Sequence, residues 1–197
     1  TDRAEEVLEE TDMAFLFAQK YHSAMKNVGP VRKEMGERTI FNILGPLTNP
    51  ANASHQLLGV YDKELVEKLA EVLVNLGVTR GMSVCGSDGL DEITVTGPTY
   101  CCEIKDGELT SYEIIPEQFG LSTYPLAELV GGTPEENAQI TKDILSGTLK
   151  GAKRDVVLMN AGIGIYLGSE NLTMEEGIKK AEELINSGEA YEKMDCL

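Results

Sequence analysis

The sequence has 197 residues, 42% of them hydrophobic and 25% charged, which is the composition of an ordinary soluble globular protein with one sizeable core. Its formal net charge of −16, with no basic run, argues against a surface that binds nucleic acid or anionic membranes. No apolar run approaches the roughly 20 residues of a membrane-spanning helix, and the acidic first residues do not resemble a signal peptide.

The first quarter of the chain predicts short elements separated by breaks. Residues 4–10 have the pattern of a short acidic helix, and the continuous apolar run at residues 13–18 indicates a buried strand. Two short helices are expected next, separated by the Gly-Pro pair at residues 29–30. Residues 38–50 mix apolar side chains at helical spacing with Gly-Pro and Asn-Pro breaks, which is typical of a helix followed by a rigid connector.

From residue 56 onward, strands and helices alternate regularly. Residues 56–61 predict a strand, and Asp62 caps a helix whose apolar side chains follow helical spacing. Residues 81–85 predict a second strand. A strand, a helix and a strand in this order form a βαβ unit, in which the two strands are parallel.

The second of these strands leads into a turn-rich acidic loop, Gly-Ser-Asp-Gly-Leu-Asp-Glu at residues 86–92. The alternation of a strand resumes at residues 93–96. Loops at the ends of α/β strands commonly hold ligands, and the adjacent carboxylates of Asp91 and Glu92 are hard oxygen ligands that suit Mg²⁺. From the seven residues of the loop alone, ordinary solvated turn residues are the more frequent explanation.

Beyond the loop the pattern becomes antiparallel. Residues 99–104 and 108–115 flank an Asp-Gly pair, which predicts a hairpin. Capping boxes begin helices at Thr133 and Thr173, and the almost wholly apolar residues 154–167 predict a helix packed inside the domain. Together these elements predict an α/β fold with a mixed, mostly parallel sheet flanked by helices.

The four cysteines show no Cys-x-x-Cys spacing. Cys101 and Cys102 are neighbours on a predicted strand, so their side chains are expected to point to opposite faces of the sheet. Reduced structural thiols in a cytoplasmic protein are the expected state of the cysteines, and no zinc site is expected.

Two side chains outside the loop are candidates by residue type. The planar guanidinium of Arg32 is suited to bind a carboxylate through two parallel hydrogen bonds. On its own, an arginine beside Lys33 and Glu34 is more often a solvated residue on a helix surface. His22 follows a tyrosine, and such a histidine is usually a packed or capping residue.

Six segments, quoted in order, carry a resemblance that covers essentially the whole chain. They are Phe-Leu-Phe-Ala at 15–18, Tyr-His-Ser-Ala-Met-Lys at 21–26, Pro-Val-Arg-Lys-Glu at 30–34, Arg-Thr-Ile-Phe-Asn-Ile-Leu-Gly-Pro-Leu-Thr-Asn-Pro at 38–50, Asp-Gly-Leu-Asp-Glu at 88–92, and Gly-Ala-Lys-Arg-Asp at 151–155. In combination they resemble the anthranilate phosphoribosyltransferase family. The most specific parts are the blocks at 38–50 and 88–92.

This resemblance implies a glycosyltransferase of tryptophan biosynthesis that joins anthranilate to phosphoribosyl pyrophosphate (PRPP), with Mg²⁺ as cofactor and pyrophosphate as second product. It implies the C-terminal α/β domain of a nucleoside phosphorylase or phosphoribosyltransferase fold over residues 1–197. It also implies that PRPP and anthranilate are the small-molecule partners, that the full-length enzyme is a cytoplasmic homodimer, and that neither nucleic acid nor membrane is bound.

The resemblance also assigns roles to individual residues. Asp91 and Glu92 would be the metal-binding pair beneath the pyrophosphate. Arg32 would bind the carboxylate of anthranilate, and His22 and Pro46 would line the anthranilate channel. No side chain is assigned a catalytic role in proton transfer.

The sequence departs from the family pattern in several places. The Gly-Thr-Gly-Gly-Asp loop that wraps the pyrophosphate and the Lys-His-Gly-Asn-Arg segment do not occur in it. The chain is therefore expected to be the C-terminal portion of a longer enzyme, inactive by itself, with residues 22–50 packing against a helical domain that is mostly missing. Cys85 stands where a histidine is expected, and Ser23 where proline is common.

Two alternatives remain open at this point. A pyrimidine or thymidine phosphorylase would share the fold and the chemistry at ribose C1, although the block from Arg32 to Pro50 argues against it; protection by thymidine but not by anthranilate would favour it. A non-catalytic domain of the same fold would tolerate Asp91→Asn without any change in metal binding.

Overall fold

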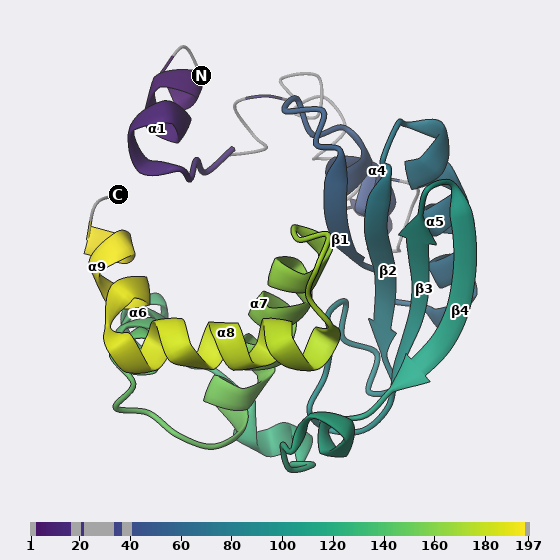
Figure 1. The fold of residues 1–197 in the computed structure, drawn as a ribbon. Coiled ribbons are helices and arrows are strands. Elements are labelled where there is room, and N and C mark those ends of the chain that lie inside the picture. The colour runs from purple at the N-terminus through teal and green to yellow at the C-terminus, as the bar shows by residue number, and fades with distance from the viewer. Residues whose placement is uncertain (1–2, 17–20, 22–33, 37–40, 196–197) are drawn as a thin grey trace. The chain divides into compact units, whose positions relative to one another are not determined.

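The protein is described here by a computed structural model of residues 3–16, 21, 34–36 and 41–195 (Figure 1). It has two compact units, one up to Ala53 and the other Ser54–Asp195. In the first unit the described helices include α1 (Ala4–Thr11) and α4 (Phe41–Leu47). The second unit holds, in chain order, β1 (His55–Gly59), α5 (Lys63–Asn75), β2 (Arg80–Gly86), β3 (Thr99–Lys105), β4 (Glu108–Ile114), the 3₁₀ turns η1 (Pro116–Phe119) and η2 (Leu126–Glu128), α6 (Pro134–Leu145), α7 (Ala152–Leu167), α8 (Met174–Ser187) and α9 (Glu189–Asp195).

The second unit is built on a mixed sheet with the strand order β1-β2-β3-β4. β1 and β2 are parallel, with Leu57 opposite Met82. β3 pairs antiparallel with β2 on one side, with Val84 opposite Cys101, and antiparallel with β4 on the other, with Cys102 opposite Ser111. The predicted mixed sheet is confirmed, but its mostly parallel character is not: among the described strands only β1 and β2 pair in parallel, because a hairpin follows the βαβ unit.

Helix α5 covers one face of the sheet and completes the predicted βαβ unit (Figure 1). It begins where the Asp62 carboxylate accepts a hydrogen bond from the backbone N–H of Glu64, at 2.9 Å. Its buried side chains lie on one stripe, as a helix packed on a sheet requires. They are Val66, Leu69, Ala70 and Leu73.

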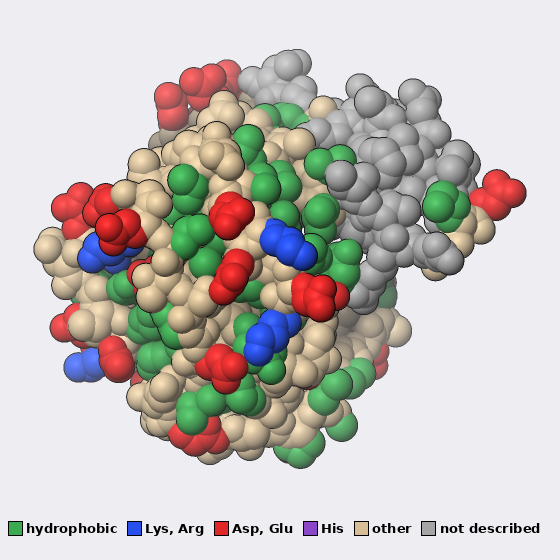
Figure 2. Space-filling model, turned by 90° about the vertical axis from the view of Figure 1, so that its right-hand side faces the viewer, with side chains coloured by type: hydrophobic (Ala, Val, Ile, Leu, Met, Phe, Trp, Pro, Cys, Tyr) green, Lys and Arg blue, Asp and Glu red, His purple; other side chains and the backbone are tan. Residues whose placement is uncertain are grey.

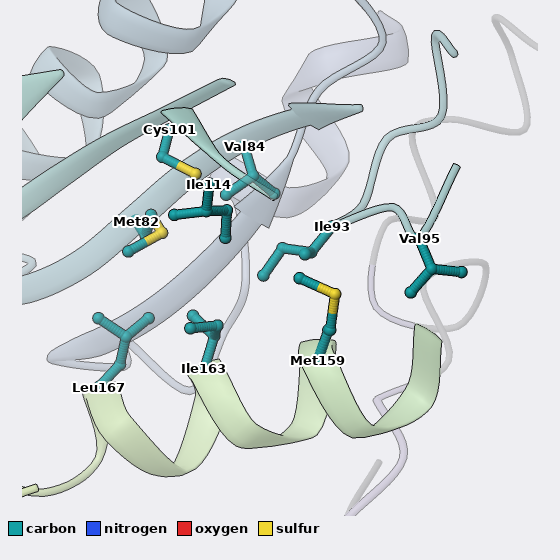
Figure 3. Close-up of a cluster of buried hydrophobic side chains, with 9 residues drawn as sticks. All are labelled: Met82, Val84, Ile93, Val95, Cys101, Ile114, Met159, Ile163 and Leu167. Atoms are coloured by element: carbon teal, nitrogen blue, oxygen red, sulfur yellow. The ribbon is translucent and has the colours of Figure 1, made fainter. Parts of the chain in front are cut away.

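Helix α7 packs on the opposite face, beneath β1 and β2. Figure 3 shows Met159, Ile163 and Leu167 pointing from α7 toward the side chains of the sheet and of the segment after β2. The sheet and that segment contribute the remaining members of this cluster, all buried: Met82, Val84, Ile93, Val95, Cys101 and Ile114. The helix predicted inside the domain is therefore confirmed as the platform of its core.

Helices α7 and α8 approach closely at two glycines. A Cβ on Gly162 would lie 2.4 Å from the Cα of Ile178, and a Cβ on Gly177 would lie 2.3 Å from the carbonyl oxygen of Gly162. Both distances are far below van der Waals contact with backbone atoms. The close crossing therefore depends on the absence of side chains at these positions.

Two alanine substitutions on α7 test this packing. Gly162→Ala should lower the free energy of unfolding by about 2–3 kcal/mol, because the helices must separate. Gly164→Ala should leave it unchanged or raise it by up to about 1 kcal/mol, since a Cβ there meets no atom within 4 Å and alanine favours helix. Urea denaturation of both variants measures the difference, and equal effects would contradict the proposed packing.

Local sequence signals account for the hairpin and the helix starts. Asp106 and Gly107 connect β3 to β4 with φ angles of 53° and 82°, the left-handed conformation that a tight hairpin turn needs. Thr133 and Thr173 each form the predicted capping box, with Glu136 and Glu176 as the respective partners. The hairpin and both boxes are confirmed.

Two predicted strands are wrong. Of residues 13–18, the described part, 13–16, has no regular structure, and Phe15 is 86% exposed. Residues 93–96 are irregular as well, although Ile93 and Val95 are fully buried. A strand needs a neighbouring strand to pair with, and neither an apolar run nor an alternating pattern supplies one.

The predicted break at Gly45-Pro46 lies inside helix α4, which ends one residue later at Leu47. Proline favours a φ near the helical value, so a helix can continue through it at the loss of one hydrogen bond. The predicted helix followed by a connector is confirmed for the described residues 41–50, of which Phe41–Leu47 are helical.

Within the described ranges, none of the helices combines the length and apolarity needed to cross a membrane. Figure 2 shows acidic side chains spread over one face, with basic and apolar side chains between them. This mixed surface agrees with the net charge of −16 and with the lack of a basic run in the sequence.

Candidate metal centre

The acidic loop at residues 86–92 follows β2 directly and lies over the carboxyl end of β1. A Cβ built on Gly59, the last residue of β1, would lie 1.6 Å from the backbone oxygen of Asp91. Gly59 therefore leaves the space through which the loop passes. Because β1 and β2 are parallel, both of their carboxyl ends meet at this edge of the sheet.

The side chain of Asp88 braces the loop from inside. Its Oδ2 accepts hydrogen bonds from the hydroxyls of Thr94 and Thr96, each at 2.6 Å, and its Oδ1 accepts one from the backbone N–H of Leu90, at 3.0 Å. Burial raises the pKa of the Asp88 carboxyl, but these hydrogen bonds outweigh it and hold the pKa below its usual value. The carboxylate is thus ionised, and both of its oxygens already accept hydrogen bonds from the protein.

Backbone hydrogen bonds close the same turn. The N–H of Gly86 donates to the carbonyl of Leu90, and the N–H of Gly89 donates to the carbonyl of Gly86, both at 2.9 Å. Gly89 has a φ of 84°, which glycine adopts without strain. The loop is therefore a defined turn.

The segment after the loop is tied to helix α7 by Asn160. Its Oδ1 accepts a hydrogen bond from the backbone N–H of Ile93 at 3.0 Å, and its Nδ2 donates to the carbonyl oxygen of Ile93 at 2.7 Å. Asp91 and Glu92 therefore lie between two anchors, Asp88 before them and Ile93 after them.

Asp91 and Glu92 are both exposed, whereas Asp88 is half-buried. Desolvation of the Glu92 carboxyl by neighbouring protein atoms, and then the negative charges of Asp91 and Asp88, raise the pKa of Glu92. A cation placed between the carboxylates of Asp91 and Glu92 would offset this repulsion. The predicted pair is thus adjacent, accessible and acidic.

The donor set fits Mg²⁺ better than a transition metal. No group of three or more His, Cys, Asp or Glu side chains able to hold a metal occurs in the described part of the chain. Mg²⁺ is commonly bound through one or two carboxylates and completes its shell with water and substrate phosphates. Asp91 and Glu92 satisfy that requirement.

A groove of about 540 Å³ lies beside the acidic loop. Glu92 and Leu90 form part of its wall, and Lys153, whose Nζ donates to the carbonyl of Glu128 at 2.5 Å, forms another part. Its remaining lining comes from the region of η2 and from α6 and α7: Leu126, Leu129, Val130, Gly131, Asn137, Ile140, Thr141 and Val156. Glu92 thus borders a largely apolar surface.

Cys85 is buried at the end of β2, and its Sγ donates to the carbonyl of Gly86 at 3.5 Å. Burial, and then the negative charges of Asp62, Asp88 and Asp91, raise the pKa of this thiol. It therefore stays protonated and acts as a packing residue. The described cysteines, Cys85, Cys101 and Cys102, are all free, as expected for reduced thiols.

The remaining sequence candidates are not tested by the geometry. His22 and Arg32 lie outside the described residues. Pro46 lies in α4, and only its backbone is described. Sequence reasoning missed the supporting residues Gly59 and Asn160; an asparagine inside a nearly apolar helix was the signal that could have indicated the second.

A family model described as the glycosyl transferase family, a/b domain, matches residues 1–191. The chain belongs to this family. It is 52% identical over 193 residues to an anthranilate phosphoribosyltransferase of Endomicrobium trichonymphae, which covers 98% of this chain and 57% of that protein. It is 54% identical over 192 residues to one of Lacticaseibacillus casei, covering 98% and 56%. This glycosyl transferase chain therefore spans a little over half the length of the curated relatives it matches.

Solved structures show the same similarity. Anthranilate phosphoribosyltransferase from Thermus thermophilus matches with a TM-score of 0.90 and 43% identity over 98% of this chain and 57% of that one. The enzyme from Saccharomyces cerevisiae in complex with PRPP and Mg matches with a TM-score of 0.90 and 32% identity, over 99% and 56%. The resemblance drawn from sequence motifs and the α/β fold class of this glycosyl transferase family member are confirmed.

Proposed function

We propose that this chain carries the metal-binding part of an anthranilate phosphoribosyltransferase, which transfers the phosphoribosyl group of PRPP to anthranilate in tryptophan biosynthesis. The observation that carries the proposal is the exposed Asp91–Glu92 pair, held on a braced loop at the carboxyl end of β2. The names of the similar proteins support it, as does the yeast structure in complex with PRPP and Mg.

In this proposal Asp91 and Glu92 hold Mg²⁺. When bound, Mg²⁺ supplies the positive charge that stabilises the pyrophosphate as it leaves. Arg32 binds the carboxylate of anthranilate, and His22 and Pro46 line the channel through which it enters. The full-length enzyme is proposed to be a cytoplasmic homodimer, in which residues 22–50 pack against a helical domain.

The chemistry requires little from a general acid or base. The amine of anthranilate forms a bond to ribose C1 while the bond from C1 to the pyrophosphate oxygen breaks, with oxocarbenium character at C1. Pyrophosphate leaves with the bonding electron pair, and the positively charged nitrogen then releases its proton to solvent. Holding the amine in line with that bond is expected to supply much of the acceleration. The residues of this chain therefore act by binding and orientation.

Metal binding by the acidic pair is tested with Mn²⁺ as a paramagnetic probe of the Mg²⁺ site. Mn²⁺ should broaden the amide resonances of residues 88–93 at low concentration. The double substitution Asp91→Asn/Glu92→Gln should abolish this local broadening, because both hard oxygen ligands lose their charge. Two-dimensional ¹⁵N NMR on the 197-residue chain measures the effect residue by residue.

The control removes the same charge from an exposed acidic pair elsewhere. Glu9→Gln/Glu10→Gln changes two neighbouring exposed residues of α1 and should leave the broadening at residues 88–93 unchanged. Equal loss in both double variants would mean that Mn²⁺ responds only to the overall negative charge of the protein, and would contradict the proposal.

Transfer activity is tested by following the loss of anthranilate fluorescence with PRPP and Mg²⁺. The 197-residue chain alone should show no turnover, because it lacks the family's pyrophosphate-wrapping motif. A full-length protein that contains it should turn over and lose at least about a hundredfold of its activity with Arg32→Ala, which removes a bidentate carboxylate contact. Thymidine phosphorolysis in place of phosphoribosyl transfer would overturn the proposal.

A further inference from the structure

Asn160 pairs with both backbone groups of a single distant residue. Its Oδ1 accepts from the N–H of Ile93, and its Nδ2 donates to the carbonyl of Ile93, 67 positions away in the chain. The N–H of Ile93 belongs to the peptide bond that begins at Glu92. One side chain of α7 thus fixes the peptide group immediately following the acidic pair.

The side chain of Ile93 is held by the same helix. It is fully buried and belongs to the cluster that contains Met159 and Ile163 of α7 (Figure 3). Backbone and side chain of Ile93 are therefore both anchored on α7, whereas Asp91 and Glu92 remain exposed. The position of the pair depends on where α7 holds Ile93.

The amide of asparagine is suited to this task for a geometric reason. It carries one acceptor and one donor group side by side, which match the N–H and the carbonyl of one extended residue. Its Nδ2 also donates to the carbonyl of Val156, one turn earlier on α7, at 2.9 Å, and this third bond holds the rotamer. Aspartate lacks the donor, and glutamine places the amide one methylene further out.

We propose that Asn160 is a positioning residue for the acidic pair: by pairing with both backbone groups of Ile93, it sets where Asp91 and Glu92 present their carboxylates to a divalent cation. The inference rests on the proposed metal-binding function of that pair. Asn160 acts through the backbone and does not itself contact the cation. Its contribution is comparable to that of residues that orient metal ligands from behind.

The test compares two variants of the same helix in the 197-residue chain. In Asn160→Ala, the affinity for Mn²⁺ at residues 88–93 should fall about tenfold, as expected for loss of a group that orients metal ligands. The backbone amide of Ile93 should also exchange with solvent at least about tenfold faster, since it loses its acceptor. Asn160→Gln should behave like Asn160→Ala, because the amide is retained but misplaced.

The matched control is Leu158→Ala. Leu158 is buried on the other side of α7, in a cluster with Ile178, Ala181 and Ile185 of α8. This variant should lose at least as much thermal stability as Asn160→Ala. At a temperature where both variants are folded, Leu158→Ala should bind Mn²⁺ as tightly as the parent chain. If Asn160 only stabilised the fold, the two variants would not differ in this way.

Two outcomes overturn the inference and are distinguishable. If Asn160→Ala binds Mn²⁺ as tightly as the parent chain, and binding in the parent chain depends on Asp91, the positioning role of Asn160 is overturned. The proposed metal-binding function then still holds. Lack of any Asp91-dependent Mn²⁺ binding in the parent chain overturns the proposed function and this inference with it. Weakened binding in Asn160→Ala but not in Leu158→Ala supports both.

Discussion

Replacing Gly59 by alanine should displace the acidic loop. The added Cβ would lie 1.6 Å from the backbone oxygen of Asp91 and 2.4 Å from its carbonyl carbon, so backbone has to move on one side or the other. Gly59 does not have a positive φ, and the whole effect is therefore steric. We expect the free energy of unfolding to fall by about 3 kcal/mol, which is at the upper end of the usual cost of adding a group to a tightly packed site.

The same variant should weaken Mn²⁺ binding at least about tenfold, because the pair moves with the loop. Urea denaturation and ¹⁵N NMR on Gly59→Ala measure the two effects. Gly97→Ala is the matched control: its Cβ would meet only the Oγ of Ser87, at 2.8 Å, which can rotate away. Native stability and native Mn²⁺ affinity in Gly59→Ala would show that the loop does not lie against β1.

The second large effect is expected from Asp88→Asn. The carboxylate accepts three hydrogen bonds, from the hydroxyls of Thr94 and Thr96 and the N–H of Leu90, and an amide has only one oxygen to accept them. We expect a loss of about 2 kcal/mol at pH 7, within the range for hydrogen bonds to a charged group at a partly buried site. Loosening of the loop should also weaken Mn²⁺ binding, as in Gly59→Ala.

The stability contributed by Asp88 should depend on pH in a defined direction. Its pKa is lower in the folded than in the unfolded chain, so the unfolded state takes up a proton first as the pH falls. The contribution is fully present above the unfolded pKa of about 3.9 and is lost as the pH falls through the folded pKa. The stability difference between the parent chain and Asp88→Asn should therefore narrow below about pH 4.

Urea denaturation of the parent chain and of Asp88→Asn checks this prediction, from pH 7 down to the lowest pH at which both are folded. Asp106→Asn, in the exposed turn between β3 and β4, removes an equal charge where asparagine tolerates the left-handed conformation. It should change stability little at any pH. A difference between the parent chain and Asp88→Asn that stays constant with pH would contradict an ionised, hydrogen-bonded carboxylate.

The sequence by itself determined the features whose hydrogen bonds close within a few residues. The Asp62 cap, the capping boxes at Thr133 and Thr173 and the Asp-Gly hairpin turn depend on side chains that reach only their own neighbourhood. Helical spacing of apolar residues likewise identified α5 before any partner was known. The motif at residues 88–92 placed two carboxylates on a loop after a buried strand.

Residue type alone could not distinguish the two aspartates of that loop; only the family resemblance assigned the metal to Asp91. Asp88 and Asp91 have the same side chain, but the hydroxyls of Thr94 and Thr96 and the N–H of Leu90 hold the first in place while the second stays exposed. The alternation at residues 93–96 predicted a strand, but Thr94 is as fully buried as Ile93 and Val95, and the segment pairs with helix α7 through Asn160 instead of with a strand.

Only the tertiary structure decided how the loop is held in place. Gly59 is required by the backbone of Asp91, and Asn160 pairs with Ile93 across 67 positions of the chain. Such contacts join elements whose separation along the sequence carries no periodic signal, and they form only after the sheet and α7 have packed together. The identity of the candidate ligands was therefore a local property of the sequence, whereas their position depends on the packing of distant segments.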